Sequence, residues 1–80
     1  MQDRIIGILA EVKQDTTLKD RVTGSSHLVE DVNLDSLQMI ELILKVQEEF
    51  SVVVDFDSFK VDHLSSLDRF TQYIASLPTA

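Results

Sequence analysis

Apolar residues recur with helical spacing at both ends of the chain. Residues 2–13 are expected to form one helix, because their apolar side chains follow the i, i+3, i+4, i+7 spacing of a single face. That face consists of Ile5, Ile8, Leu9 and Val12. A last helix should begin after Ser65 or Ser66, either of which can act as N-cap, and end at Pro78, which cannot continue it. Its apolar face consists of Leu67, Phe70, Ile74 and Leu77.

A central helix is predicted from Asp35 to about Phe50. Asp35 is a good N-cap, and Gln38 can reach back to it as in a capping box. At about 100° per residue, the apolar residues of this helix form two stripes separated by roughly 130°. The first, a core stripe, consists of Met39, Leu42, Ile43, Val46 and Phe50. The second, called the outer stripe below, consists of Leu37, Ile40 and Leu44, and it is bordered by Glu41 and Glu48. The outer stripe is either buried by a second layer or exposed for a partner.

The remaining segments predict connections. Residues 14–34 lack a sustained apolar period and should form a long loop, pinned to the core by Leu18, Val22, Leu28 and Val32. Residues 51–54 suit a short extended link, and residues 57–62 a single short helical turn. The predicted fold is all-α: a four-helix bundle of three main helices and one short third helix, with a long first loop, in a single domain of residues 1–80.

Composition narrows the classes of function. Eighty residues, 44% of them hydrophobic, suffice for one small core and leave little room for a catalytic cleft. The absence of cysteine excludes a disulfide framework, a thiolate zinc site and a cysteine nucleophile. No apolar run approaches the length of a membrane span, and the first residues do not resemble a secretory signal. We therefore expect a cytoplasmic protein.

The charge is unevenly distributed. The net charge is −7, and residues 30–62 contain nine acidic residues but only two basic ones, Lys45 and Lys60. Such a chain is a poor ligand for nucleic acid, whose phosphates are neutralised by Lys and Arg. The acidic central segment favours a partner with a basic protein surface instead.

Ser36 is the most informative single residue. It follows the N-cap Asp35, where free backbone N–H groups and the helix dipole favour an anion. A serine at this position is suited to carry a phosphate ester. By itself it would be read as an ordinary serine at the start of a helix, so its interpretation depends on the residues around it.

Those surrounding residues resemble the acyl carrier protein family. The motifs that carry the resemblance are Leu28-Val29-Glu30-Asp31, Leu34-Asp35-Ser36-Leu37, Glu41-Leu42 and Glu48-Glu49-Phe50. The Asp-Ser-Leu tripeptide is weak evidence alone, but the four motifs together match the family's spacing. The similarity runs from the first helix to Tyr73-Ile74.

The resemblance implies a carrier without catalytic residues or a metal of its own. Ser36 would be esterified with 4′-phosphopantetheine, transferred from coenzyme A by a separate phosphopantetheinyl transferase, and would carry acyl groups as thioesters. Asp35 and Leu37 match the motif neighbours of the serine. The implied partners are that transferase and acyltransferases, ketosynthases or other enzymes of fatty acid or polyketide biosynthesis. Their docking positions correspond to Leu37, Ile40, Glu41, Leu44 and Glu48. Membrane insertion is not expected, and the protein should be a monomer.

Departures from the family pattern leave the pathway open. Gln38, Lys45 and Gln47 make the exposed helix face less acidic than in typical fatty-acid carriers. A carrier of aminoacyl or peptidyl groups on the same scaffold is one alternative, although the approach Asn33-Leu34-Asp35 favours acyl cargo. A helical interaction module without the prosthetic arm is the other, and the intact Ser36 argues against it.

Two other constellations are weaker. Residues 31–35 resemble the start of a calcium-binding EF-hand loop, but Ser36 stands where the loop needs Gly and Leu42 where it needs Glu. Ser36 could also be drawn into a triad with His27 or His63, yet nothing marks an oxyanion hole. Both histidines are expected to be structural or exposed.

Overall fold

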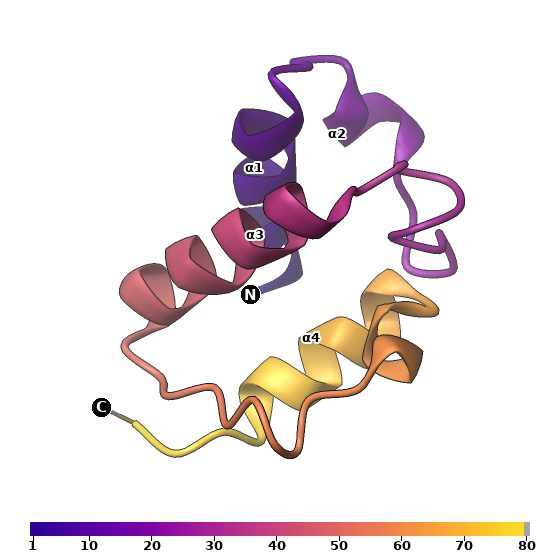
Figure 1. The fold of residues 1–80 in the computed structure, drawn as a ribbon. Coiled ribbons are helices and arrows are strands. Elements are labelled where there is room, and N and C mark those ends of the chain that lie inside the picture. The colour runs from indigo at the N-terminus through magenta and orange to yellow at the C-terminus, as the bar shows by residue number, and fades with distance from the viewer. Residues whose placement is uncertain (80) are drawn as a thin grey trace.

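The computed structural model describes residues 1–79. The helices are α1 (Gln2–Lys13), α2 (Leu18–Arg21), α3 (Ser36–Phe50), the 3₁₀ helix η1 (Val61–Leu64) and α4 (Leu67–Ala75). Figure 1 shows α3 crossing in front of α1, with α4 below α3 in this view. The first and last helices also meet, since Gln2 Nε2 donates to Asp68 Oδ1 at 2.8 Å. Among the described residues the only β-type pairing is an isolated bridge between Val52 and Thr79. The all-α bundle with three main helices is thus confirmed.

The first and third helices form where the apolar pattern predicts them. All four residues of the predicted α1 face are buried, and the helix ends at Gln14 in the left-handed conformation with φ 53°. In α3, Leu42, Ile43 and Val46 are buried, and Met39 and Phe50 pack against the core from partly buried positions. The core stripe is therefore confirmed, and it joins α3 to a single core with α1 and α4.

The long first loop contains a short helix that the prediction missed. The Asp15 carboxylate accepts hydrogen bonds from the Thr17 amide at 2.9 Å and the Thr17 hydroxyl at 2.6 Å. This turn starts α2, one helical turn that buries Leu18. Leu28 and Val32 are also buried, whereas Val22 is only partly so.

The loop is tied to the other end of the bundle by backbone hydrogen bonds. Leu28 N donates to Leu64 O at 2.9 Å, Leu67 N to Ser26 O at 3.0 Å, and Asp68 N to Gly24 O at 2.9 Å. These bonds fix the path of the chain that leads to α3.

The one short helix that was predicted lies a few residues further along the chain. Residues 57–62 do not form the expected helical turn. Instead, the Ser58 and Phe59 amides both donate to Asp55 O, which makes a tight turn, and the helical geometry begins only at Val61. The reason is that Lys60 is extended, with φ −127°, and its amide donates to His63 Nδ1 at 3.0 Å.

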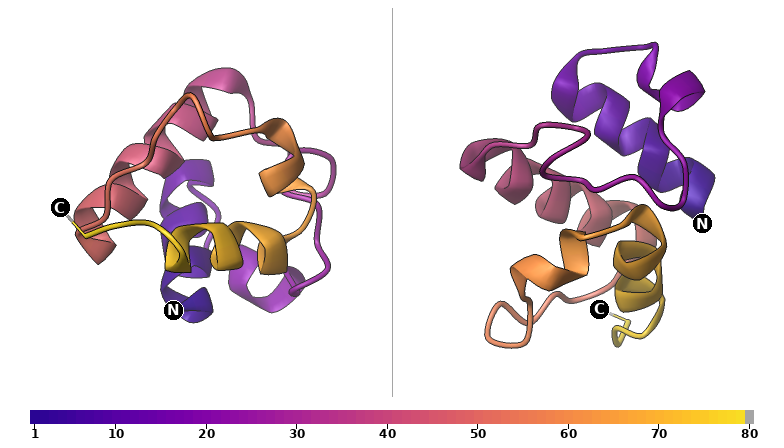
Figure 2. Two further views of the ribbon diagram at one scale, coloured as in Figure 1. Left: turned by 90° about the horizontal axis from the view of Figure 1, so that it is seen from below. Right: turned by 90° about the vertical axis from the view of Figure 1, so that its right-hand side faces the viewer.

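The C-terminal part follows the prediction except for its end. Ser66 is the N-cap of α4, and its hydroxyl accepts a hydrogen bond from the Arg69 amide at 3.0 Å. The helix stops at Ala75, before Pro78, and Leu77 packs against the core from beyond it. The chain then returns beside the segment that follows α3, where Val53 N donates to Pro78 O at 3.1 Å. The left view of Figure 2 shows the C-terminal end of the chain near the end of α3. The predicted extended link over residues 51–54 is confirmed from Val52 onward by this pairing. It is wrong at Ser51, which is the C-cap of α3 in the left-handed conformation, with φ 52°.

Candidate functional site

The start of α3 is fixed by a complete capping box. The Asp35 carboxylate accepts a hydrogen bond from the Gln38 amide at 2.7 Å, and the Gln38 side chain accepts one from the Asp35 amide at 3.2 Å. Lys13 on α1 strengthens this corner, since its Nζ donates to Gln38 Oε1 at 3.1 Å and to Asn33 O at 2.9 Å. Local capping and one contact from α1 therefore set where α3 begins.

Ser36 is the first residue of α3 and is exposed to solvent. The Gln38 amide is taken by the Asp35 side chain and the Met39 amide by Asp35 O. Among the described residues, the amides of Ser36 and Leu37 remain without a partner in the first turn. A phosphate ester on the Ser36 oxygen would lie at the helix end where free N–H groups and the positive end of the helix dipole favour an anion. The residues present thus fit a phosphate-linked prosthetic group.

The outer stripe is exposed. Leu37, Ile40 and Leu44 keep 65%, 50% and 54% of their accessible surface. Half-exposed leucine and isoleucine side chains in a row on one helix are costly to leave in water and typical of a protein interface. Of the two alternatives for this stripe, burial by a second layer is wrong for the isolated chain.

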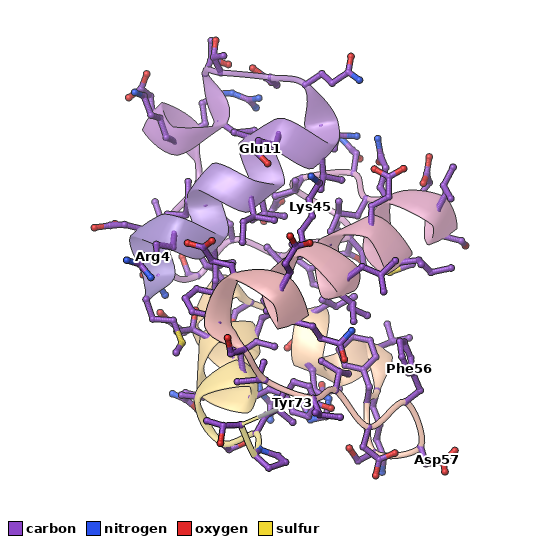
Figure 3. All side chains as sticks on the ribbon, turned by 90° about the vertical axis from the view of Figure 1, so that its left-hand side faces the viewer. Arg4, Glu11, Lys45, Phe56, Asp57 and Tyr73 are labelled. Carbon is purple, nitrogen blue, oxygen red and sulfur yellow. The ribbon has the colours of Figure 1, made fainter. Side chains whose placement is uncertain are left out.

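The acidic residues beside the outer stripe occupy different surroundings. Glu41 is half-buried, whereas Glu48 is exposed and lines a cleft of about 340 Å³ between α1 and α3. The remaining lining residues are Arg4, Gly7, Ile8, Glu11, Lys45 and Glu49. Figure 3 shows Arg4 and Glu11 on α1 and Lys45 on α3 around this region.

Two ion pairs cross the cleft. Arg4 Nη1 lies 3.7 Å from Glu49 Oε1, and Lys45 Nζ lies 3.6 Å from Glu11 Oε2. Within residues 1–79, neither Glu41 nor Glu48 has a cationic partner within 4.0 Å. The sequence predicted the carboxylates but not these pairs, because the pairs depend on how α1 packs against α3.

The histidines are used structurally, as expected. His27 Nδ1 accepts hydrogen bonds from the Val29 and Glu30 amides at 3.2 and 3.1 Å. His63 Nδ1 accepts the Lys60 amide, and its ring stacks on Tyr73 with a centroid separation of 4.2 Å. Both imidazoles support turns of the backbone, and over residues 1–79 no hydrogen bond joins either to Ser36 as a triad would require.

The residues of the EF-hand-like segment also have other roles. Asp31 Oδ2 accepts the His27 amide at 2.8 Å, and the Asp35 carboxylate caps α3. Over residues 1–79 no group of three or more His, Cys, Asp or Glu side chains is arranged to hold a metal ion. In the same part of the chain, no helix is long and apolar enough to cross a membrane.

The small helical bundle with an exposed serine at a capped helix start is compatible with the class of phosphopantetheine-bearing carriers, and comparison with known proteins shows that class. Residues 3–74 match the family described as "Phosphopantetheine attachment site". An acyl carrier protein of Buchnera aphidicola is 43% identical over 59 residues, covering 71% of this chain and 76% of that protein. A mitochondrial acyl carrier protein of Neurospora crassa is 37% identical over 60 residues, covering 74% of this chain and 42% of that protein.

An aminoacyl carrier protein of Bradyrhizobium diazoefficiens is also similar, at 35% identity over 54 residues, covering 68% of this chain and 60% of that protein. Two of these three relatives are longer, and the chain spans less than two thirds of their length. The chain belongs to the acyl carrier protein family, whose prosthetic group is phosphopantetheine.

Proposed function

We propose that this protein carries acyl groups as thioesters on a 4′-phosphopantetheine arm attached to Ser36. The observation that carries the proposal is the exposed Ser36 at the first turn of α3, held in place by the Asp35 capping box within a chain of this family. Leu37 follows the serine and projects into solvent, where an enzyme acting on Ser36 would contact it. The arm supplies a terminal thiol when it is bound, which this cysteine-free chain cannot supply itself.

Attachment requires one substitution at phosphorus. The Ser36 oxygen forms a new phosphate ester with the pantetheine phosphate of coenzyme A and loses its proton, and adenosine 3′,5′-bisphosphate leaves. Among the described residues, His27 and His63 form no hydrogen bond to Ser36 and instead accept backbone amides through Nδ1. In this proposal a base on a separate phosphopantetheinyl transferase takes the proton, and the carrier catalyses no step itself.

The attachment site can be tested by intact mass. A broad-specificity phosphopantetheinyl transferase with coenzyme A should add one phosphopantetheine to the wild type and none to Ser36→Ala. Ser25→Ala is the matched control, because Ser25 is also exposed but lies in the loop before α3. Modification of Ser36→Ala, or none of the wild type, would contradict the proposal. The latter result would favour the unmodified interaction module.

Partner enzymes are proposed to dock on α3 through Leu37, Ile40 and Leu44, with Glu41 and Glu48 facing basic groups. The exposed apolar row supplies contact area, and the carboxylates have no cation of their own among the described residues. Opposite charges speed encounter, and salt screens them. The partners are the transferase and enzymes such as acyltransferases and ketosynthases.

Charge reversal tests this surface. Glu41→Lys and Glu48→Lys should each slow modification of Ser36 at low salt while leaving far-UV circular dichroism unchanged. Asp20→Lys provides the control, since it makes the same charge change on α2. If all three variants were equally slow, net charge rather than the α3 surface would govern the encounter.

A second cargo class has specific support. The similarity to an aminoacyl carrier protein of Bradyrhizobium diazoefficiens makes an amino acid thioester the alternative. The phosphopantetheine-loaded protein can be offered to an acyl-activating and an amino-acid-activating enzyme in parallel, with thioester formation followed by mass. Loading with the amino acid alone would replace acyl cargo with aminoacyl cargo.

We further propose that the protein acts as a single-domain monomer in the cytoplasm. Light scattering after size exclusion would test the first part and cell fractionation the second. The Neurospora crassa relative is described as mitochondrial, so recovery of the protein in an organelle fraction would contradict the cytoplasmic location.

A further inference from the structure

Lys45 lies among carboxylates on its own helix. Glu41 precedes it by four residues, and Glu48 and Glu49 follow it by three and four. Residues at these spacings are neighbours on a helix surface, and Glu four residues before Lys is the favourable order for an ion pair. Considered within α3 alone, Lys45 should therefore fold over Glu41 and neutralise part of the edge that the proposed function needs.

The structure places the Lys45 side chain elsewhere. Its Nζ lies 3.6 Å from Glu11 Oε2 on α1, and Figure 3 shows the two side chains pointing toward one another between the helices. Lys45 and Glu11 keep 47% and 69% of their side-chain surface, so the pair is open to solvent. Arg4 and Glu49 form the other pair across the same cleft. Thus Lys45 pairs with α1 and not with Glu41 or Glu48, neither of which has a cationic partner within 4.0 Å among the described residues.

We propose that Glu11 is a positioning residue for the docking surface. By holding Lys45 on the α1 side, it leaves the Glu41 and Glu48 carboxylates free to meet Lys and Arg side chains of a partner protein. The inference rests on the proposed docking at α3. It adds that α1 sets the charge that the partner meets, although α1 itself does not contact the partner.

The expected effect is modest, because the pair is exposed. Ion pairs between solvent-exposed side chains contribute little free energy. Moving Lys45 from one exposed carboxylate to another should therefore change the KM by about twofold to fivefold. Removing the Glu11 charge should release Lys45 to Glu41 and raise the KM of a phosphopantetheinyl transferase for the protein by about that factor. The kcat should not change, since Ser36 and its capping box are untouched.

A double-mutant cycle separates relocation of Lys45 from loss of net charge. Glu11→Gln, Lys45→Gln and the double variant are compared with wild type for KM and kcat at low salt. Asp3→Asn is the matched control, because it removes one exposed negative charge from the same helix without an ion pair in the described structure. Circular dichroism and melting temperature establish that each variant is folded.

The proposal expects Glu11→Gln to raise KM more than Asp3→Asn does, and Lys45→Gln to abolish that increase in the double variant. Lys45→Gln should therefore lower KM more in the Glu11→Gln background than in the wild type. The proposal would be overturned if Lys45→Gln changed the KM equally in both backgrounds. It would also be overturned if the double variant had a KM as high as that of Glu11→Gln. A wild type that accepts no phosphopantetheine would instead overturn the proposed function, so the two failures are distinct.

Discussion

Replacing Asp35 with alanine should destabilise the fold by about 1 kcal/mol, the usual cost of removing an N-cap side chain. The substitution removes the 2.7 Å hydrogen bond from the Gln38 amide and leaves that donor without its partner at the start of α3. Because Lys13 still holds Gln38 and Asn33 in place, the rest of the corner should survive. For a domain of this size, about 1 kcal/mol lowers the melting temperature by roughly 4–8 °C.

Asp35→Asn distinguishes capping geometry from charge. Asparagine keeps a side-chain oxygen acceptor and is as good an N-cap as aspartate, so its melting temperature should stay within a few degrees of wild type. Thermal unfolding followed by far-UV circular dichroism at low and high salt provides the measurement. If Asn were as destabilising as Ala, and salt removed the difference from wild type, the charge at the helix dipole would be the stabilising element. No loss of stability in Asp35→Ala would refute the capping argument.

Three further predictions follow from particular residues. Gly7→Ala should stabilise α1 by about 0.5–1 kcal/mol, since a Cβ at this position meets nothing within 4 Å. Gly24→Ala would instead push against the Asp68 carboxylate. Urea unfolding of both variants checks this difference. Added salt should raise the melting temperature, because the net charge is −7 and screening weakens the repulsion; an unchanged value from low to high salt would refute it. Hydrogen bonds from Thr17, together with Arg21, lower the pKa of Asp15 below 3.8. The stability that the Asp15 carboxylate contributes should therefore be present above pH 3.8 and lost as the pH falls through the folded-state pKa. In acid unfolding, the stabilities of the wild type and Asp15→Asn should converge at low pH.

The parts of the fold that were predictable have local causes. The start of α3 was placed correctly because Asp35 and Gln38 form the capping box within four residues of sequence. The outer stripe was separated from the core stripe by helical periodicity alone, and the exposure of Leu37, Ile40 and Leu44 agrees. The site residues of α3 therefore follow from one helix and its cap.

The parts that were missed depend on different causes. The start of α2 has a local signal, the hydrogen bonds between Asp15 and Thr17. The segment was predicted as a loop because it is rich in Thr, Ser, Asp and Gly. The position of η1 depends on a tertiary contact, because the His63 ring that accepts the Lys60 amide is also stacked on Tyr73 of α4. The Glu11–Lys45 pair likewise requires the packing of α1 on α3. Periodicity in a single segment carries no information on such contacts.

The packing of α3 is uneven, and this bears on where a cargo could lie. The Cα atoms of α3 approach those of α1 within 8 Å, but within the described chain none comes that near to η1 or α4. The space on that side is filled by side chains of the single core, including Leu42, Leu64 and Phe70, all with 0% exposure. Separating α3 from η1 and α4 would disturb side-chain packing without breaking a backbone hydrogen bond between these helices. We therefore expect this seam to open more easily than the interface between α1 and α3.

An acyl chain attached through Ser36 should enter this seam. Each methylene taken out of water contributes about 0.8 kcal/mol, so a chain of about eight carbons gains several kcal/mol on burial. The close-packed core must part to admit it, because native interiors hold few voids of that size. Loading saturated chains of increasing length should shift the amide signals of Leu42, Ile43 and Val46 progressively, with smaller shifts in α1, and raise the melting temperature until it levels off. If the shifts stayed at Ser36 and its sequence neighbours for every chain length, the cargo would lie in solvent and the seam would have no part in holding it.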